Sequence, residues 1–351
     1  MIWKQQFSPH LLEMQFRSTP LLKNILMQQD ANINSPYDGI RVYSDNVVSK
    51  EFWKLVQPAI YNVGLITNED RYRYQLNHPL VHVMWGKLYG HLPNTIIRIN
   101  PHTNNMTPAV MLDIISFILG DYDDVKVAKW DEKIDVTEYT SHEVAKRIYV
   151  PNKKSLPKNP RHSNSTYYYG SQYGEQVKVY NKAKQKRLAG QLTRIEKTCL
   201  VSKGKRKTLT EFLLHDRNDV FKNMNMVDID LLDGRSKMKR LINSEKTLMH
   251  AYYQLTQAER KKFKRHPAFI YQCLDIHSML KSSIEDWLQT SPLLRLKILV
   301  DHWTYLVSKV TLTSHWIQPV QFQVNIQLQG WDKNGRSKLS ITSSSVPFEF
   351  N

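Results

Sequence analysis

Three segments in the middle of the chain, residues 129–135, 177–182 and 192–197, place apolar and charged side chains at alternating positions. Successive side chains of a β-strand point to opposite faces, so this alternation is typical of strands that are buried on one face only. In the second segment, Val177 and Val179 would point into the core, and the charged residues would lie on the other face. The sequence therefore predicts a sheet with one packed face and one polar face.

Patterns elsewhere complete an α+β chain. Strands are expected at residues 40–43, 71–76, 81–88, 96–99, 125–136, 166–169, 176–180 and 191–200. Helices are expected at residues 108–119, 141–149, 241–255, 256–264, 270–280 and 292–310. The first of these helices begins after Thr107, with a proline at its first position, and ends before Gly120. Alternation at residues 322–328 and 339–341, around a turn at 332–335, predicts a terminal hairpin.

We expect three regions in the 351 residues, a length typical of about two domains. The first is an N-terminal helical extension over residues 1–35. The second is a sheet domain with helices on one face over residues 36–215. The third is a mostly helical region over residues 216–351 that ends in the hairpin.

The charge of the chain favours a nucleic-acid partner. Lys and Arg number 49 against 32 Asp and Glu, which gives a net charge of +17. Basic residues in clusters release counterions when they neutralise phosphates, whereas a membrane partner would require a basic helix with a broad apolar face, which is not evident. The two cysteines, Cys199 and Cys273, support neither a disulfide framework nor a cysteine zinc site. With no signal peptide and no apolar run near the ~18 residues of a membrane span, we expect a cytoplasmic protein.

Two carboxylates share one face of the first segment. Asp131 and Asp135 lie four residues apart on that strand, with Lys133 between them. Their repulsion requires a cation nearby, which is either Lys133 in a structural role or a divalent metal ion in a functional one.

One tyrosine of the second segment lies between two lysines on the polar face. Lys178 and Lys182 flank Tyr180 at two residues on either side. Positive charge favours the phenolate, so this pattern predicts an activated nucleophile beside a phosphate site. The alternative is a tyrosine on a solvated basic face. In the third segment, Arg194 and Glu196 share a face and could contact a phosphate and a metal ion, or form a surface ion pair.

The order of these motifs resembles that of the rolling-circle replication initiators of Staphylococcus-type plasmids and, more distantly, the filamentous-phage gene II replication protein. The resemblance is carried by residues 129–135, 168–172, 177–182 and 193–196, and less specifically by residues 37–40 and 99–101. It extends over roughly residues 37–200.

This resemblance implies an antiparallel-sheet, relaxase-like nicking domain over residues 36–215 and a DNA-binding or accessory role for residues 216–351. Such an enzyme nicks one strand of an origin hairpin with a tyrosine, stays attached to the 5′ phosphate and later rejoins the ends. Tyr180 would be the nucleophile, and Lys182 and Arg194 would contact phosphate. Asp131 and Glu196, with Asp135 as a further candidate, would bind Mg²⁺ or Mn²⁺. The implied partners are single-stranded or hairpin origin DNA, a host helicase and polymerase, and a second copy of the chain.

The chain departs from the family at three points. Lys129 stands where an arginine is usual, Gln185 stands where a glutamate is usual, and no His-hydrophobic-His pair occurs. A histidine ligand from elsewhere, His102 or His82, is an alternative to a surface role for either residue.

Other tyrosines and the basic clusters have secondary roles in this interpretation. Tyr167, Tyr168, Tyr169 and Tyr173 lack the flanking lysines of Tyr180 and are expected to stack on unpaired bases. The residues expected to contact DNA are Lys178, Arg194, Lys184, Lys186, Arg187, Lys205, Arg206, Lys207, Lys261 and Lys262. The alternative function is an origin-binding regulator without catalysis, and an RNA-binding module is disfavoured because its aromatic-glycine sheet motifs are absent.

Overall fold

The computed structural model describes residues 33–63, 71–78, 80–151, 166–170, 175–214, 220–291, 322–331 and 337–345. The expected helix at 292–310 lies outside the described residues, as do Tyr173 and all but the last three residues of the expected N-terminal extension. The chain divides into two compact units, Met1–Ile298 and Leu299–Asn351. In the second unit, β12 (Phe322–Trp331) pairs antiparallel with β13 (Ser337–Ser345), which confirms the predicted hairpin.

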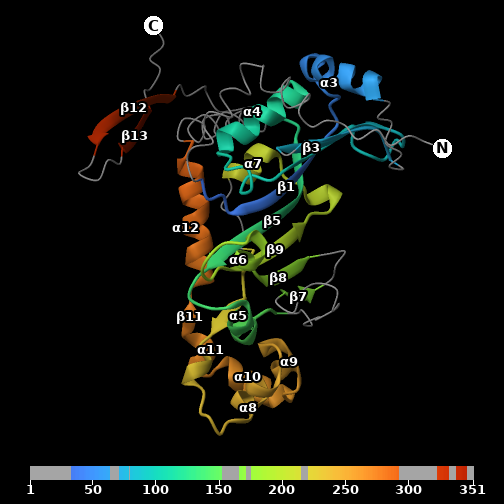
Figure 1. The fold of residues 1–351 in the computed structure, drawn as a ribbon. Coiled ribbons are helices and arrows are strands. Elements are labelled where there is room, and N and C mark those ends of the chain that lie inside the picture. Colours follow the sequence, from blue (N-terminus) through green and yellow to red (C-terminus); the bar gives the residue numbers. More distant parts are fainter. Residues whose placement is uncertain are drawn as a thin grey trace, which may run out of the picture. The chain divides into compact units, whose positions relative to one another are not determined.

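The first unit is built on an eight-stranded sheet with the order β2-β3-β4-β1-β5-β9-β8-β7 (Figure 1). Its strands are β1 (Tyr37–Ser44), β2 (Tyr72–Asn77), β3 (Val81–Lys87), β4 (Thr95–Ile99), β5 (Lys126–Val136), β7 (Thr166–Gly170), β8 (Gln176–Asn181) and β9 (Thr193–Leu200). All neighbouring strands pair antiparallel. The predicted α+β class with an antiparallel sheet is therefore confirmed.

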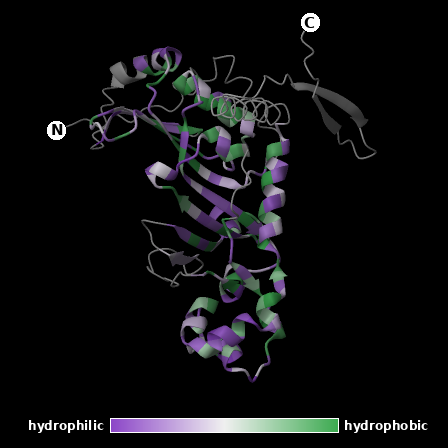
Figure 2. Cartoon of the chain, turned by 180° about the vertical axis from the view of Figure 1, so that it is seen from behind, coloured by the Kyte–Doolittle hydropathy of each residue, from purple (hydrophilic) through white to green (hydrophobic). Residues whose placement is uncertain are grey.

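One hydrophobic core covers the β2 to β5 part of the sheet. Its helices are α3 (Lys50–Val63), α4 (Pro108–Leu119), α7 (Leu209–Leu214) and α12 (Ile276–Gln289). Helix α4 begins at the Thr107 cap and ends at Gly120, as the sequence predicts. Helix α12 carries hydrophilic and hydrophobic residues along its length (Figure 2), and its buried Trp287 donates a hydrogen bond to the Met106 carbonyl at 2.8 Å. Long-range packing therefore joins α12 to the sheet domain.

A second core lies over the β7 to β9 part of the sheet. Its helices are α5 (Ser141–Arg147), α8 (Lys237–Ser244), α9 (Leu248–Tyr253), α10 (Gln257–Lys264), α11 (Pro267–Ile270) and the first part of α12. A small sheet of β11 (Gln272–Leu274), β10 (Asn225–Val227) and β6 (Ile148–Tyr149) joins them. The helix expected at 241–255 is wrong as one element, because the Thr247 cap starts a new helix after α8 ends. The helix expected at 270–280 is likewise replaced by the end of α11, then β11 and the start of α12.

The predicted site residues on β5, β8 and β9 lie on the face opposite these cores. Residues that pair across antiparallel strands share a face, and the apolar pairs, such as Val42 with Ile97 and Ile134 with Ile195, belong to the cores. Lys133 pairs with Glu196, and Glu196 with Lys178, so these charged residues share the other face. None of the described helices has both the length and the hydrophobicity to span a bilayer.

Candidate functional site

Strands β5, β9 and β8 bring the predicted site residues together on the polar face of the sheet. The pairings are Asp131 with Thr198, Lys133 with Glu196, Asp135 with Arg194, Lys178 with Glu196, and Tyr180 with Arg194. Residues far apart in the sequence therefore become neighbours on three adjacent strands.

The hydroxyl of Tyr180 donates a hydrogen bond to a carboxylate. Its acceptor is Oε2 of Glu196 at 3.0 Å, and Oε1 of Glu196 accepts from Lys178 Nζ at 2.6 Å. Tyr180 is 9% exposed and Glu196 is 5% exposed. Burial, followed by the negative charge of Glu196, raises the pKa of Tyr180 well above its ordinary value. The expectation that two lysines lower this pKa is wrong, because burial and the contact with Glu196 raise it and Glu196 also pairs with Lys178.

The second lysine of the motif is not on the strand. Strand β8 ends at Asn181, whose side chain caps the short helix α6 (Lys182–Lys186). Lys182 therefore does not continue the alternation, which corrects the prediction. Its Nζ nevertheless lies 5.6 Å from the centre of the Tyr180 ring and donates to Oε1 of Gln185 at 2.9 Å. A cation thus lies beside the ring, and the side chain of Gln185 holds it.

Arg194 is the centre of a buried ionic cluster. Its side chain is 1% exposed and donates to both carboxylate oxygens of Asp135 at 2.7 and 2.8 Å, and to Asp38 at 2.7 Å. Asp38 is the extra residue of a β-bulge between Tyr37 and Gly39, and this bulge allows its side chain to reach Arg194. Burial alone would raise the pKa of Asp135, but Arg194 and Lys133 lower it to about 2. In this arrangement, Arg194 has almost no surface to offer a phosphate.

His102 completes the cluster by contacting the guanidinium of Arg194. Its Nε2 lies 2.8 Å from Nη2 of Arg194, so Nε2 is the acceptor and Nδ1 carries the proton. This Nδ1 is buried and has no hydrogen-bond partner among the described residues. Burial, followed by the charges of Lys133 and Arg194, lowers the pKa of His102 to about 4. His102 is therefore neutral at physiological pH.

The unfolding free energy should decrease as the pH falls from about 6.5 toward about 4 because of His102. Below its ordinary pKa of about 6.5, the unfolded chain binds a proton that the folded chain does not, which favours unfolding. The variant His102→Gln keeps an acceptor for Arg194 but cannot titrate. Urea denaturation at about pH 7 and about pH 5 should show a larger loss in the unmodified protein than in the variant, on the order of 1 kcal/mol. Equal losses would contradict this assignment.

The three predicted metal ligands do not converge. Both carboxylate oxygens of Asp135 accept hydrogen bonds from Arg194, and those of Glu196 accept hydrogen bonds from Lys178 and Tyr180. Within the described part of the chain, no group of three or more His, Cys, Asp or Glu side chains could hold a metal ion. The predicted trio therefore does not fit one shared ion.

Asp131 has an oxygen partner that the sequence did not indicate as a ligand. A Cβ atom at Gly39 would lie 3.4 Å from Oδ2 of Asp131 and 3.3 Å from Oδ1 of Asn100, so both oxygens border the same small space. Oδ1 of Asp131 accepts a hydrogen bond from Thr198, and Lys129 Nζ lies 3.8 Å from Oδ2. A site with one carboxylate and one amide oxygen suits Mg²⁺, which usually takes its remaining ligands from substrate phosphates and water.

Tyr168 is the described tyrosine of β7 that shares the polar face with Tyr180. It pairs with Lys178, whereas Tyr167 and Tyr169 pair with Val179 and Val177 on the packed face. Tyr169 is completely buried, and the hydroxyl of Tyr167 lies 2.8 Å from Nδ1 of His142. Of these three tyrosines, only Tyr168 is on the face where it could stack on a base.

The predicted DNA-binding lysines and arginines are spread over several elements. Those exposed to solvent are Lys184 and Lys186 in α6, Arg187 after it, Lys205 and Lys207 after β9, and Lys261 and Lys262 in α10. Arg206 is half-buried, with its guanidinium 4.5 Å from the centre of the Tyr43 ring.

No protein-family model matches the chain, and no curated protein matches it. Among solved structures, one similar chain is described as a rolling circle replication initiator protein from Geobacillus stearothermophilus. It is 12% identical in sequence with a TM-score of 0.33, and the match covers 58% of this chain and 89% of that chain. A likeness of this size establishes no shared activity, so the arrangement of the site residues has to carry the functional assignment.

Proposed function

We propose that this protein initiates rolling-circle DNA replication by nicking and rejoining one strand of an origin, with Tyr180 as nucleophile. The observation that carries the proposal is the hydrogen bond from the Tyr180 hydroxyl to Glu196 on a sheet face that also carries Lys178. A phenol in contact with a carboxylate has an acceptor for its proton, and the adjacent cations can hold a phosphate. The net charge of +17 favours a polyanionic substrate.

The chemistry follows from these contacts. Because the pKa of Tyr180 is raised, its proton has to leave as the bond to phosphorus forms, and Oε2 of Glu196 is the acceptor in contact. The Tyr180 oxygen attacks the scissile phosphate and the bond from phosphorus to the 3′ oxygen breaks. That oxygen takes a proton from water and leaves as a 3′ hydroxyl, and Glu196 returns the proton of Tyr180 to water. The 5′ phosphate stays on the tyrosine. Rejoining reverses these steps, since the phosphotyrosine bond replaces the phosphodiester bond that was broken.

A Mg²⁺ or Mn²⁺ ion is part of the proposal, held by Asp131 and Asn100 rather than by the trio of carboxylates. When bound, the ion would neutralise charge on the scissile phosphate. The side chains of Lys178 and Lys182 would orient the phosphate beside Tyr180. Origin DNA is the proposed partner, and a helicase, a polymerase and a second copy of the chain remain expectations from the family.

The test is formation of a covalent protein–DNA adduct. The full chain is incubated with Mn²⁺ and a library of labelled single-stranded hairpins, and the products are separated on a denaturing gel. A band that contains protein and label, and that requires the metal, is the expected result. If no adduct forms on any hairpin while the protein still binds DNA, the alternative of a non-catalytic origin-binding regulator replaces the proposal.

Mn²⁺ binding distinguishes the two possible ligand sets. Asp131→Asn should weaken Mn²⁺ binding by at least roughly tenfold, because the ion loses its carboxylate. Asp135→Asn should change it little, because Arg194 occupies both oxygens of Asp135. Calorimetric titration with Mn²⁺ in the presence of a single-stranded oligonucleotide measures both variants. A loss of equal size in Asp135→Asn would restore the ligand set expected from the family.

A further inference from the structure

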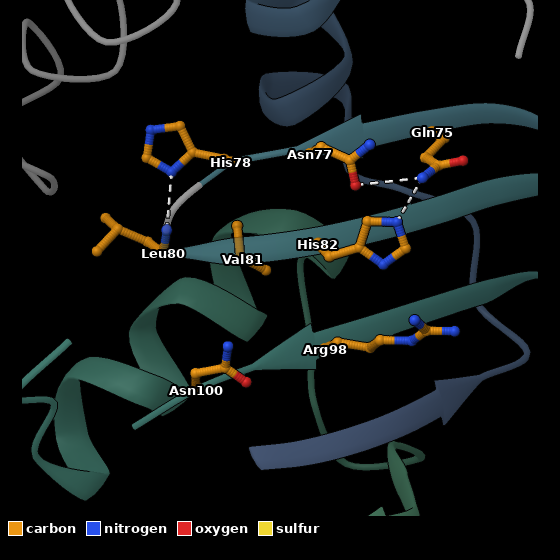
Figure 3. Close-up of a pocket in the computed structure, with 8 residues that line it drawn as sticks. All are labelled: Gln75, Asn77, His78, Leu80, Val81, His82, Arg98 and Asn100. Carbon is orange, nitrogen blue, oxygen red and sulfur yellow. Dashed lines mark hydrogen bonds between the residues drawn. The ribbon is translucent and has the colours of Figure 1, made fainter. Parts of the chain in front are cut away.

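A polar cavity lies at the end of the sheet away from Tyr180. Its volume is about 460 Å³, within the usual range for small-ligand sites. The polar side chains that line it are Gln75, Asn77, His78, His82, Arg98 and Asn100, from β2, β3, β4 and the segments beside them (Figure 3). Among the described residues of the lining there is no carboxylate and one guanidinium, so the cavity favours a polar ligand that carries negative charge or is attached to it.

The amide of Gln75 organises the interior of this cavity. Its Nε2 donates to Oδ1 of Asn77 at 3.2 Å and lies 2.7 Å from Nε2 of His82 (Figure 3). Because the amide nitrogen is a donor, Nε2 of His82 is the acceptor and its Nδ1 carries the proton. The Nδ1 of His82 is buried, so His82 holds the Gln75 amide in place and does not itself face a ligand. The cavity therefore presents fixed side-chain amides, which can donate to and accept from the edge of a nucleobase.

A row of polar side chains, three of them cationic, connects the cavity to the candidate site. Along the polar face, Asn77 pairs with His82, His82 with Arg98, Arg98 with Arg41, and Arg41 with Lys129. Neighbouring strands are about 4.8 Å apart, so this row of five residues spans roughly 19 Å. Asn100 lines the cavity and also faces Asp131 across Gly39. The cavity and the proposed metal site are therefore continuous on one sheet face.

We propose that this cavity binds an unpaired base of the DNA strand that is nicked, while Arg98, Arg41 and Lys129 hold the phosphates that lead to Asp131. The inference rests on the proposed function and adds a substrate requirement to it, namely a single-stranded segment beside the scissile phosphate. A paired base lies inside the duplex and cannot enter such a pocket without leaving the stack. Double-stranded DNA of the same sequence is therefore excluded as the ligand of this cavity.

The test measures equilibrium binding of single-stranded homopolymers of dA, dC or dT, each about 20 nucleotides long, by fluorescence anisotropy in EDTA. The full chain should bind the homopolymers with different affinities. Asn77→Ala and His82→Ala should each reduce binding of the preferred homopolymer about tenfold and remove the preference, with duplex binding unchanged. His91→Ala is the matched control, since His91 is exposed and lies outside the cavity. His82→Gln, which keeps a polar group, serves if the alanine variant does not fold.

The phosphate row has its own signature. Arg98→Ala should weaken the binding of all homopolymers by the same factor. It should also reduce the slope of log affinity against log salt concentration by about 0.7 for each phosphate that the variant no longer neutralises. Equal binding of all homopolymers by the full chain, or equal losses for duplex and single strands in the Asn77 and His82 variants, would overturn the proposal. Binding is measured in EDTA, where no cleavage occurs, and the adduct is measured separately with Mn²⁺. Base-dependent binding in EDTA together with no adduct in Mn²⁺ would overturn the nicking function and leave the assignment of the cavity to an unpaired base standing.

Discussion

Tyr180→Phe is expected to abolish the covalent protein–DNA adduct, with a loss of roughly 10³-fold or more in adduct formation. The substitution removes the hydroxyl that forms the bond to phosphorus and leaves the ring beside Lys182. Glu196 keeps its ion pair with Lys178 at 2.6 Å, so the cost in stability should be about 1 kcal/mol, the value of one hydrogen bond. Denaturing gels measure the adduct, and anisotropy with the same hairpins measures binding, which should stay within about twofold.

Tyr168→Phe is the matched control for this prediction. Tyr168 lies on the same polar face and pairs with Lys178, so it is the nearest competitor for the role of nucleophile. It should retain the adduct. If the adduct persists in Tyr180→Phe and disappears in Tyr168→Phe, the nucleophile is on β7, and the contact between Tyr180 and Glu196 is structural.

For the site residues that lie on strands, the period-two patterns predicted which face each occupies, because side-chain direction in a strand depends only on position along the chain. Lys182 was the exception, because β8 ends before it. They could not predict the register between strands. The contact between Tyr180 and Glu196 depends on β8 and β9 pairing Tyr180 with Arg194 and Lys178 with Glu196. A shift of one residue would move Glu196 to the packed face.

The ionic cluster around Arg194 could not be predicted because it depends on long-range contacts. Arg194 contacts Asp38 and His102, which lie 156 and 92 residues away in the sequence, and a β-bulge brings Asp38 within reach of Arg194. No local pattern encodes such a cluster.

Helix α3 was also missed, and here the cause is local. Pro58 lies inside the helix, and proline usually ends a helix pattern.

Arg194→Met is expected to lower the unfolding free energy by about 3 to 5 kcal/mol. The guanidinium is 1% exposed and compensates Asp135, whose side chain is 19% exposed, and Asp38, at 26%. Methionine fills a similar volume but leaves both carboxylates without their main partner. Lys133 still contacts Asp135 at 2.9 Å, which offsets part of the loss. Chemical denaturation at neutral pH measures the change.

Two further variants separate the ionic contribution from packing. Arg194→Met combined with Asp135→Asn should be more stable than Arg194→Met alone. Asp135 loses both of its hydrogen bonds from Arg194, and the second substitution replaces its charged carboxylate with a neutral amide. Arg187→Met removes an exposed arginine and should change the unfolding free energy by less than about 0.5 kcal/mol. If Arg194→Met lies within about 1 kcal/mol of the unmodified protein, the cluster does not hold the face together. In that case Arg194 is free to move toward a phosphate, as the resemblance to the replication initiators implies.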